Sequence, residues 1–459
     1  MRRLFRRFPA SLLGAGSLVL ALAAALPCPA AAEVPAPPTA AAAVPKLEIP
    51  EAARAAPGFD VDKATEAWIA TIPADKRARS DAYFEGQYGI LFLDWAWTVG
   101  VAALLLAGGR AQRWRDQVRT RIRRRYLADL VLLARILGAT LVLSLPLGLW
   151  TGWWREHAYG MSNQTLGAFL LDWAKGFGVT LVLAAPMIAA LYAVVRRSPR
   201  NWWLWGAALM VAFMAFGATI APVFIDPLFN KYQKLEAGPL RDDILSLARA
   251  ERVPADDVFW FDASRQTKRI SANVSGFAGT TRIALNDNLL RRSPRETILA
   301  VLGHEMGHYV LHHVTETLVS FGLVILAGFA FVHFAFGGVL RRWGAGWGVE
   351  GIADPAGYPL AVALLWTFLT FTAPVTNSII RINEAEADAF GIAVSNEPDG
   401  FAFAAVQLSE YRKMRPGPLE EVVFYDHPSG YDRIRRSMEW KALHLDEFIA
   451  RERAAAPPP

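Results

Sequence analysis

The stretch Gly303-His304-Glu305-Met306-Gly307-His308 contains an HExxH motif, and it lies between two hydrophobic stretches long enough to cross a membrane. On a helix, His304 and His308 are four residues apart and project from one face. Two imidazole nitrogens there can hold one zinc ion, while Glu305 reaches a water at the metal. The motif in this setting predicts a metalloprotease embedded in a bilayer.

The residues before the motif predict a buried helix. Ser293-Pro294-Arg295-Glu296 has the pattern of a capping box, with a serine N-cap and proline at the first helical position. Four apolar residues of the same helix favour a buried position over a solvated one, namely Ile298, Leu299, Val301 and Leu302. HExxH fixes only three residues, so an ordinary helix without metal is the alternative.

A third metal ligand is expected downstream, because a catalytic zinc takes three protein ligands and keeps a fourth position open. Residues 381–390, Arg-Ile-Asn-Glu-Ala-Glu-Ala-Asp-Ala-Phe, follow a hydrophobic span. We expect Glu384 to be the ligand. Asp388 shares its helix face and is expected to accept the free N–H of a ligating histidine. The alternative is an acidic, solvated helix face.

Five motifs occur in a fixed order along the chain. They are Asn-Gln-Thr-Leu-Gly at 163–167, Ile-Asp-Pro-Leu-Phe-Asn-Lys-Tyr at 225–232, Leu-Ala-Val-Leu-Gly-His-Glu-Met-Gly-His at 299–308, Glu-Ala-Glu-Ala-Asp-Ala at 384–389, and His427-Pro428 with Arg433 behind it. Over residues 163–434 the sequence resembles the type 1 CAAX prenyl protease family. These are integral-membrane zinc metalloproteases of the gluzincin type, related to bacterial heat-shock membrane proteases.

The resemblance implies a role for each residue of the site. The zinc ligands would be His304, His308 and Glu384. Glu305 would be the general base, and Asp388 would accept a hydrogen bond from a ligating histidine. His427 would face the site and bind substrate or the oxyanion; the alternative is a histidine that caps a turn before Pro428. Arg433 is either an ion-pair partner of the active-site carboxylates or a solvated charge.

Residues 271–277 resemble the family's substrate-binding edge strand, with Asn273 at the asparagine position. The family usually follows this asparagine with alanine and an aromatic residue, and Val274-Ser275 departs from that pattern. An extended peptide would add to such an edge through main-chain hydrogen bonds. Asn273 is therefore the expected substrate-binding residue.

The composition favours a multi-span membrane protein over several soluble domains. Of the 459 residues, 53% are hydrophobic and 16 are tryptophan. The net charge of +6 is carried largely by arginine in short loops, which favours membrane topology over nucleic-acid binding as its explanation. The only cysteine, Cys28, lies in the signal-like N-terminus, so no disulfide forms within the chain.

We expect a mainly α, multi-span membrane protein whose HExxH protease domain is split by a transmembrane hairpin and carries a small β-sheet. Spans are expected near 90–108, 128–152, 169–195, 203–225, 316–338 and 358–380. The expected organisation is a signal peptide or retained first span at 1–32, an Ala/Pro-rich linker and extramembrane segment at 33–88, four transmembrane helices at 89–225, the first protease half at 226–315, the hairpin at 316–380, the second half at 381–451 and a disordered tail at 452–459.

The short loops predict the membrane side. Arginines are concentrated in residues 109–127, 196–200 and 341–342, whereas residues 153–167 contain a single arginine, Arg155. The positive-inside rule makes the first three loops cytoplasmic. Counting spans then puts both protease halves outside, which predicts a multi-pass protein of a bacterial inner membrane with a periplasmic active site. A cytoplasmic site, as in eukaryotic members of the family, is the alternative.

The predicted function is zinc-dependent endopeptidase cleavage of membrane-associated or exported proteins, with one Zn²⁺ per chain. The alternative is a catalytically inactive membrane chaperone or scaffold that keeps the fold. A metal transporter is disfavoured, because the histidines cluster in the extramembrane half and not along the spans. The expected partners are protein or peptide substrates and the lipid bilayer, and no nucleic acid.

Overall fold

The computed structural model of the chain describes residues 45–276 and 281–455. The signal sequence expected at 1–32 lies outside these residues. The chain divides into two compact units, which are described separately. One contains Leu93–Ala193 and Phe336–Ala363, and the other contains the described part of Pro35–Phe92 together with Val194–Ala335 and Leu364–Pro459. Helices account for 75% of the structure, as the mainly α expectation required.

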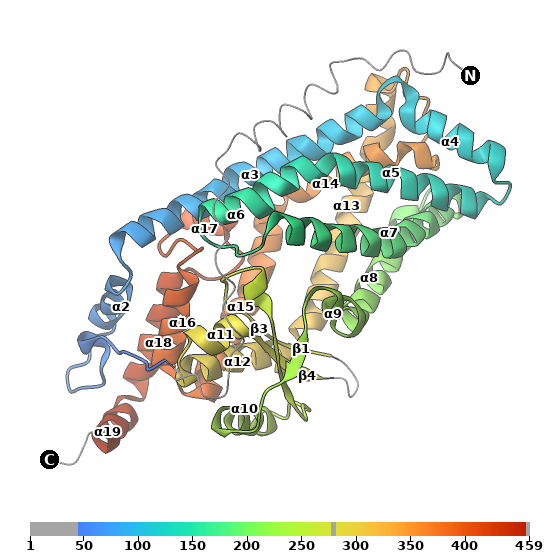
Figure 1. The fold of residues 1–459 in the computed structure, drawn as a ribbon. Coiled ribbons are helices and arrows are strands. Elements are labelled where there is room, and N and C mark those ends of the chain that lie inside the picture. Colours follow the sequence, from blue (N-terminus) through green and yellow to red (C-terminus); the bar gives the residue numbers. More distant parts are fainter. Residues whose placement is uncertain (1–44, 277–280, 456–459) are drawn as a thin grey trace. The chain divides into compact units, whose positions relative to one another are not determined.

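The elements follow one another as labelled in Figure 1. Up to the sheet they are η1 Glu51–Ala53, α2 Val61–Ala70, α3 Ala74–Leu106, α4 Arg110–Arg121, α5 Arg125–Gly148, α6 Arg155–Ala158, α7 Leu166–Arg197, α8 Trp202–Ile220 and α9 Asp226–Phe229. Then come β1 Tyr232–Lys234, α10 Pro239–Ala250, β2 Val258–Phe261, β3 Ala272–Ser275, β4 Arg282–Asn286, α11 Asp287–Arg292 and α12 Arg295–Val310. The chain continues with α13 His313–Trp343, η6 Pro355–Gly357, α14 Tyr358–Phe371, α15 Ala373–Ser395, α16 Pro398–Leu408, α17 Pro418–Phe424, α18 Gly430–Leu443 and α19 Leu445–Ala455.

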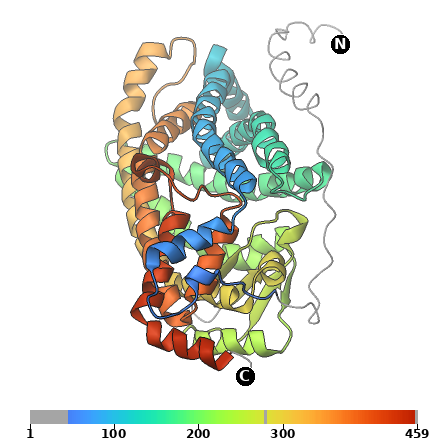
Figure 2. The same cartoon turned by 90° about the vertical axis from the view of Figure 1, so that its left-hand side faces the viewer.

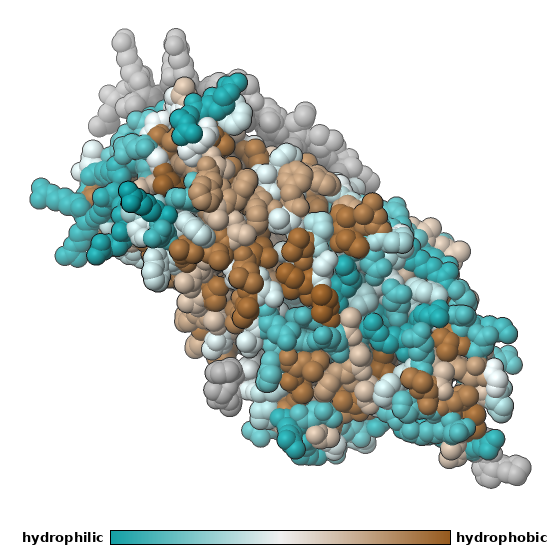
Figure 3. All heavy atoms as spheres, turned by 180° about the vertical axis from the view of Figure 1, so that it is seen from behind, coloured by the Kyte–Doolittle hydropathy of each residue, from teal (hydrophilic) through white to brown (hydrophobic). Residues whose placement is uncertain are grey.

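Five helices of the described chain are long and apolar enough to cross a membrane: Ala74–Arg121, Arg125–Ala158, Leu166–Arg197, Trp202–Phe229 and His313–Trp343. Their exposed apolar side chains contribute to the brown surface in Figure 3. The sixth expected span is not one straight helix. It is broken at Thr372, where α14 and α15 meet at a bend of 58°. Pro374 in the first turn of α15 lacks the N–H that a continuous helix would need.

The first unit packs α5 against α7. Leu133 and Leu137 of α5 are buried with Ile188 and Tyr192 of α7. The unit also contains a buried ion pair between Arg115 of α4 and the carboxylate that precedes η6, Asp354.

The second unit contains a four-stranded sheet in the order β1-β2-β4-β3. β2 and β4 are parallel, and the two outer pairings are antiparallel. The edge strand expected within 271–277 corresponds to β3, and β2 and β4 complete the small sheet with β1. β3 pairs with β4 alone, with Asn273 opposite Ala284, so it is an edge strand of the sheet.

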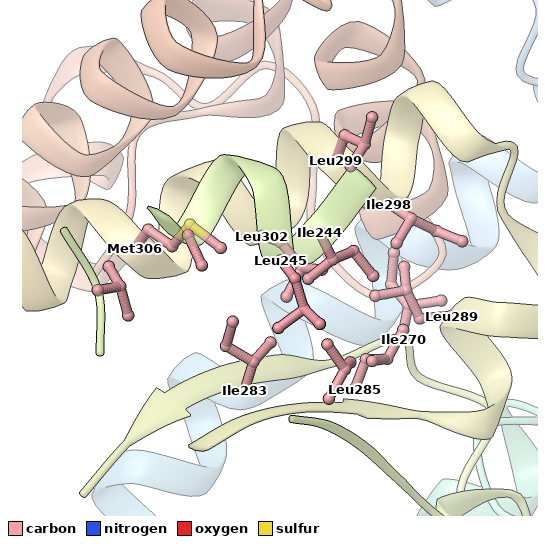
Figure 4. Packing of buried hydrophobic residues seen from close by; sticks show 13 residues of the cluster. Ile244, Leu245, Ile270, Ile283, Leu285, Leu289, Ile298, Leu299, Leu302 and Met306 are labelled. Carbon is pink, nitrogen blue, oxygen red and sulfur yellow. The ribbon is translucent and has the colours of Figure 1, made fainter. Parts of the chain in front are cut away.

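The core of the second unit lies between this sheet and two helices, as Figure 4 shows. Ile283 and Leu285 of β4 are two residues apart, so both side chains project from one face of the sheet. They meet Ile244 of α10 and the apolar face of α12, where Leu302 is fully buried. Each such side chain contributes roughly 1.5–3 kcal/mol on burial. This packing fixes the helix that carries HExxH.

The described residues 45–88 of the segment before the first span are folded and pack against the protease helices. Trp68 of α2 is 1% exposed and packs with Ala402 of α16 and Met438 of α18. Figure 2 shows these N-terminal and C-terminal segments side by side. The buried Lys441 donates to the carbonyl of Ala53 at 2.6 Å and to Asp399 at 2.8 Å. The alanines of this segment provide apolar contacts for helix packing, which the expectation of a linker overlooked.

The C-terminal end also differs in part from the expected tail at 452–459. Residues 452–455 continue α19, and Glu452 accepts the backbone N–H of Ala55 at 2.9 Å.

Candidate active site

The HExxH helix, α12, begins at Arg295 with Pro294 as its N-cap residue. The capping box expected at 293–296 is wrong, because the buried Ser293 donates its hydroxyl to Gln407 of α16 at 2.8 Å. The serine therefore ties two helices together instead of satisfying the helix end. Ile298 and Leu302 are fully buried on this helix, as the apolar pattern predicted.

Glycines let α12 and α15 approach closely. A Cβ atom on Gly391 of α15 would lie 2.6 Å from the backbone nitrogen of His304, and one on Gly303 would lie 3.0 Å from the carbonyl oxygen of Gly391. Real Cβ atoms do not approach other atoms at 2.6 Å, so the two backbones touch only because side chains are absent. This contact brings the acidic face of α15 against the HExxH histidines.

The three expected ligands converge. His304 Nε2 and His308 Nε2 lie 3.1 Å apart. Glu384 places Oε2 at 3.3 Å from His304 Nε2 and Oε1 at 3.4 Å from His308 Nε2. One ligand atom from each residue lies within 4.8 Å of the other two.

A cation fits between these atoms. Glu384 Oε2 is buried and accepts no hydrogen bond from any residue that the structure describes, although it faces imidazole nitrogens. An unpaired carboxylate oxygen in a buried site is costly. Two imidazoles and one carboxylate are a donor set that suits zinc with an open position. The residues present therefore fit the metal that the motif implies.

His304 has a carboxylate behind it. Its Nδ1 lies 2.9 Å from Asp388 Oδ1, and Asp388 is fully buried. Burial opposes a charge on the His304 ring, but Asp388 and Glu384 outweigh burial and raise the pKa of His304 to about 9. The two carboxylates thus favour positive charge on the His304 ring, at the place where a metal ion would bind.

Glu305 is half-buried and lines the cavity in front of the ligands. Burial and the nearby Glu384 raise the pKa of its carboxyl group, against the opposing effect of His304 and His308. A raised pKa suits a group that takes up a proton and later returns it.

His427 faces the same site from the segment before α18. Its Nε2 lies 3.1 Å from Glu384 Oε2, and its Nδ1 lies 2.7 Å from Asp426 Oδ1. Burial lowers the pKa of His427, although Asp426 opposes this. Asp426 therefore holds the ring through Nδ1, and Nε2 is directed at the ligands.

The residues enclose a cavity of about 230 Å³. Its polar side contains His304, Glu305, Glu384, His427 and Arg433, and its apolar side contains Ile270, Val301, Phe401, Ala404, Ala405 and Leu408. Ser271 and Ala272 bring the edge strand to the cavity, whereas Asn273 is not among the lining residues. Ser275 donates its hydroxyl to Asn273 Oδ1 at 3.2 Å.

The sequence reasoning missed three neighbours of the site. Arg412 lines the cavity and lies 3.4 Å from His427. Asp426, next to His427 in sequence, was a visible signal for a carboxylate–histidine pair. His313 contacts His308 but lies beyond the end of the HExxH helix, where the motif gives no sign of it.

The fold and the site together define an integral-membrane metalloprotease. A sequence profile for peptidase family M48 matches residues 234–441, and a profile described as "CAAX prenyl protease N-terminal, five membrane helices" matches residues 64–231. The chain belongs to peptidase family M48. The resemblance of its motifs to CAAX prenyl proteases is thereby confirmed.

Relatives of this family are similar over most of the chain. "Uncharacterized metalloprotease YhfN" of Bacillus subtilis is 30% identical over 73% of this chain and 79% of its own length. "CAAX prenyl protease 1 homolog" of Arabidopsis thaliana is 28% identical over 67% of this chain and 73% of its own. The crystal structure of S. mikatae Ste24p has the same fold, with a TM-score of 0.63 and 21% identity, and the match covers 80% of this chain and 89% of that one.

Proposed function

We propose that the protein is a zinc metalloendopeptidase in which His304, His308 and Glu384 hold one Zn²⁺ per chain. The observation that carries this proposal is the convergence of these three side chains around a buried Glu384 oxygen that has no hydrogen-bond donor among the described residues. Asp388 and Arg433 are positioning residues for His304. Glu305 is the general base.

Bound zinc supplies a Lewis acid for the scissile carbonyl and for the attacking water. Glu305 takes the proton of that water and delivers it to the leaving amine. The buried pair of Asp388 and Arg433 keeps the ring of His304 in one orientation. His427 lies beside Glu384 with its Nδ1 held by Asp426, and we assign it to the binding of substrate or of the developing oxyanion.

The substrate is proposed to be an extended peptide that adds to the free edge of β3 around Asn273. The edge position of β3 supports this assignment. Because Ser271 and Ala272 also line the cavity, a peptide on this edge would direct a side chain toward the apolar wall of Phe401, Ala405 and Leu408. Membrane-associated or exported proteins are the proposed substrates.

We further propose that the site faces the periplasm of a bacterial inner membrane. The start of α3 contacts the protease halves: Lys413 bonds Glu85 at 2.7 Å, and Arg269 bonds Tyr83 at 2.6 Å. α3 then crosses once to the arginine-rich residues 109–127. Those arginines are cytoplasmic by the positive-inside rule, which supports an outer protease.

The number of spans supports the same side. The profile that matches residues 64–231 is described by five membrane helices, whereas this chain has four candidates there, Ala74–Arg121, Arg125–Ala158, Leu166–Arg197 and Trp202–Phe229. Four crossings put the start of α3 and the protease half that follows α9 on the same side of the membrane, whereas five crossings would put them on opposite sides. CAAX prenyl proteases would otherwise suggest prenylated C-terminal peptides, which an outward site does not meet. A reporter fused after Arg451 tests the side, and activity of a cytoplasmic reporter alone would reject it.

The enzymatic proposal is tested by metal content and by one variant. Purified wild type should contain one zinc per chain, and Glu305→Gln should keep the zinc but stop peptide cleavage. Glu439→Gln, an exposed carboxylate of α18, is the control and should cleave normally. Protein N-termini that appear in cells with the wild-type protein, but are absent from cells with Glu305→Gln, would identify substrates. Retained cleavage by Glu305→Gln would remove Glu305 from the mechanism, and metal-free wild type would reject the zinc site.

A further inference from the structure

Among the residues that the structure describes, none places a carboxylate directly at Nδ1 of His308, as Asp388 does for His304. Nδ1 of His308 lies instead 2.9 Å from Nδ1 of His313, the first residue of α13. The Nε2 atom of His313 lies 3.3 Å from Glu386 Oε2. The two rings are 5.0 Å apart between centroids and inclined at 70°. A line of polar contacts thus leads from one proposed ligand to an acidic side chain on α15.

The positions of the protons in this line follow from the chemistry of imidazole. A neutral ring carries one N–H, and a ring that gives Nε2 to a metal must carry its proton on Nδ1. His308 then donates to His313 Nδ1, which acts as the acceptor. The proton of His313 is therefore on Nε2, where Glu386 accepts it. Each nitrogen in the line has one role, and no two protons face each other.

We infer that His313 and Glu386 are positioning residues that fix the ring of His308 for metal binding, which rests on the zinc site proposed above. Partners behind a metal ligand set the tautomer and orientation of its ring and increase its basicity. Asp388 performs this function directly for His304. The carboxylate for His308 acts through a second imidazole.

The burial of the residues is consistent with this assignment. The His313 side chain is 4% exposed, whereas Glu386 is 55% exposed. The imidazole of His313 therefore carries the contact from the half-buried His308 to a carboxylate that water still solvates. A carboxylate placed directly against His308 would have to be buried at a desolvation cost.

The backbone between α12 and α13 makes the contact possible. Only Leu311 and His312 separate the two helices, and His312 has φ of 60°, in the left-handed region that residues with a side chain seldom adopt. The chain turns at this point, and the ring of His313 lies against the ring of His308. Strain of this kind is retained where the surrounding structure requires it.

Glu316 provides a rival explanation and a matched control. Its carboxylate, with His313 and Glu386, could surround a second cation. Among the hydrogen bonds of the described residues, however, none joins the Glu316 side chain to His313, whereas Glu386 makes one. A relay needs Glu386 alone, and a second cation site needs both glutamates.

The experiment compares four variants of the full-length zinc protein: His313→Leu, His313→Gln, Glu386→Gln and Glu316→Gln. Zinc loss to a chelator is timed, and kcat and KM are measured separately. Glutamine at 313 offers an oxygen to the His308 N–H and an N–H to Glu386, and leucine offers neither. We expect zinc affinity to fall roughly 10- to 100-fold in His313→Leu, several-fold in Glu386→Gln, little in His313→Gln and not at all in Glu316→Gln, with KM unchanged throughout.

Three results would overturn the inference. Equal zinc loss in His313→Leu and His313→Gln would show that the imidazole acts by packing. Equal effects of Glu386→Gln and Glu316→Gln, with a second zinc in wild type, would indicate a cation site. Wild-type zinc retention in Glu386→Gln and His313→Leu would show that His308 needs no partner. If His313→Leu does not fold, the variants Glu386→Gln and Glu316→Gln, which change exposed side chains, still distinguish these outcomes. Wild type without zinc would reject the proposed function itself, which separates the two failures.

Discussion

Arg433 on α18 forms a two-point ion pair with Asp388 on α15: Nε lies 3.0 Å from Oδ2, and Nη2 lies 2.5 Å from Oδ1. Asp388 is fully buried and also lies beside His304. Burial opposes the charge on Arg433, but Asp388 outweighs burial and raises the pKa of the guanidinium. The carboxylate of Asp388 thus contacts both a proposed metal ligand, His304, and helix α18.

Replacing Arg433 with methionine should destabilise the protein by about 3–5 kcal/mol, because Asp388 would remain buried without its counter-ion. The His304 ring should also hold metal less tightly. Unfolding in detergent, followed by tryptophan fluorescence, measures the first effect. Arg435→Met on the same helix is the control, because Arg435 pairs with the exposed residues Asp62 and Glu439. Equal losses of stability in the two variants would contradict the assigned role of the buried pair.

Gly391→Ala should separate α15 from α12, because the added methyl group would lie 2.6 Å from the His304 nitrogen. We expect a loss of about 1–3 kcal/mol in stability and weaker zinc binding, since Glu384 moves with α15. Gly176→Ala, in a helix where a Cβ meets nothing within 4 Å, should leave zinc binding intact. Metal titration of both variants distinguishes the effects, and normal affinity in Gly391→Ala would disprove the close-contact explanation.

Trp68→Ala should remove about 3–5 kcal/mol of stability, since this side chain is 1% exposed between α2 and two protease helices. Leu443 at the end of α18 is 80% exposed, so Leu443→Ala should change stability by less than about 0.5 kcal/mol. Thermal unfolding of both variants provides the measurement. A Trp68→Ala protein as stable as wild type would contradict a stabilising role for the packing of α2 against α16 and α18.

The free energy of unfolding should fall as pH rises from about 4.5 to about 7, because Glu397 loses its proton in this range. Burial, with help from Glu296, raises the pKa of Glu397 from 4.5 to about 7. The folded state therefore binds more protons than the unfolded state within that range, so its stability is greatest below the range and lowest above it. Glu397→Gln should remove this slope and stabilise the protein at pH 8 by on the order of 2 kcal/mol. Parallel pH profiles in wild type and variant would show that another group is responsible.

Removing metal should lower the melting temperature. A ligand present at a thousand times its dissociation constant stabilises the folded state by about 4 kcal/mol. Chelation of wild type should therefore produce a clear downward shift that added zinc reverses. His304→Ala should melt at the same temperature with and without chelator. A chelator-induced shift in His304→Ala equal to that of wild type would indicate metal bound elsewhere.

The sequence allowed the local parts of the site to be predicted. His304, Glu305 and His308 lie within five residues of one helix, and the spacing of Glu384 and Asp388 sets their common face on another. The structure brings these side chains together with His427 and settles the ambiguity of Arg433, which is buried in an ion pair. Their chemical roles stay predictions.

The parts that were missed depend on contacts between distant segments or on one backbone angle. No periodicity near Trp68 indicates a partner on α18, far along the chain. The position of His313 depends on the left-handed conformation of His312, which its residue type does not predict. The break at Thr372 was hidden because hydrophobicity continues across it. Ser293 was misassigned because its hydroxyl had two available partners, and tertiary packing selected Gln407.

The packing of α2 against α16 and α18 has a consequence for biosynthesis. Trp68 emerges from the ribosome early, but the helices that cover it come from residues 398–443. At roughly 5–20 residues per second, translation needs tens of seconds to supply them. For part of that time His304 and His308 also lack Glu384, and His427 follows later still. The residues that complete the candidate active site and the helices that cover Trp68 therefore both come from the last part of the chain to be made.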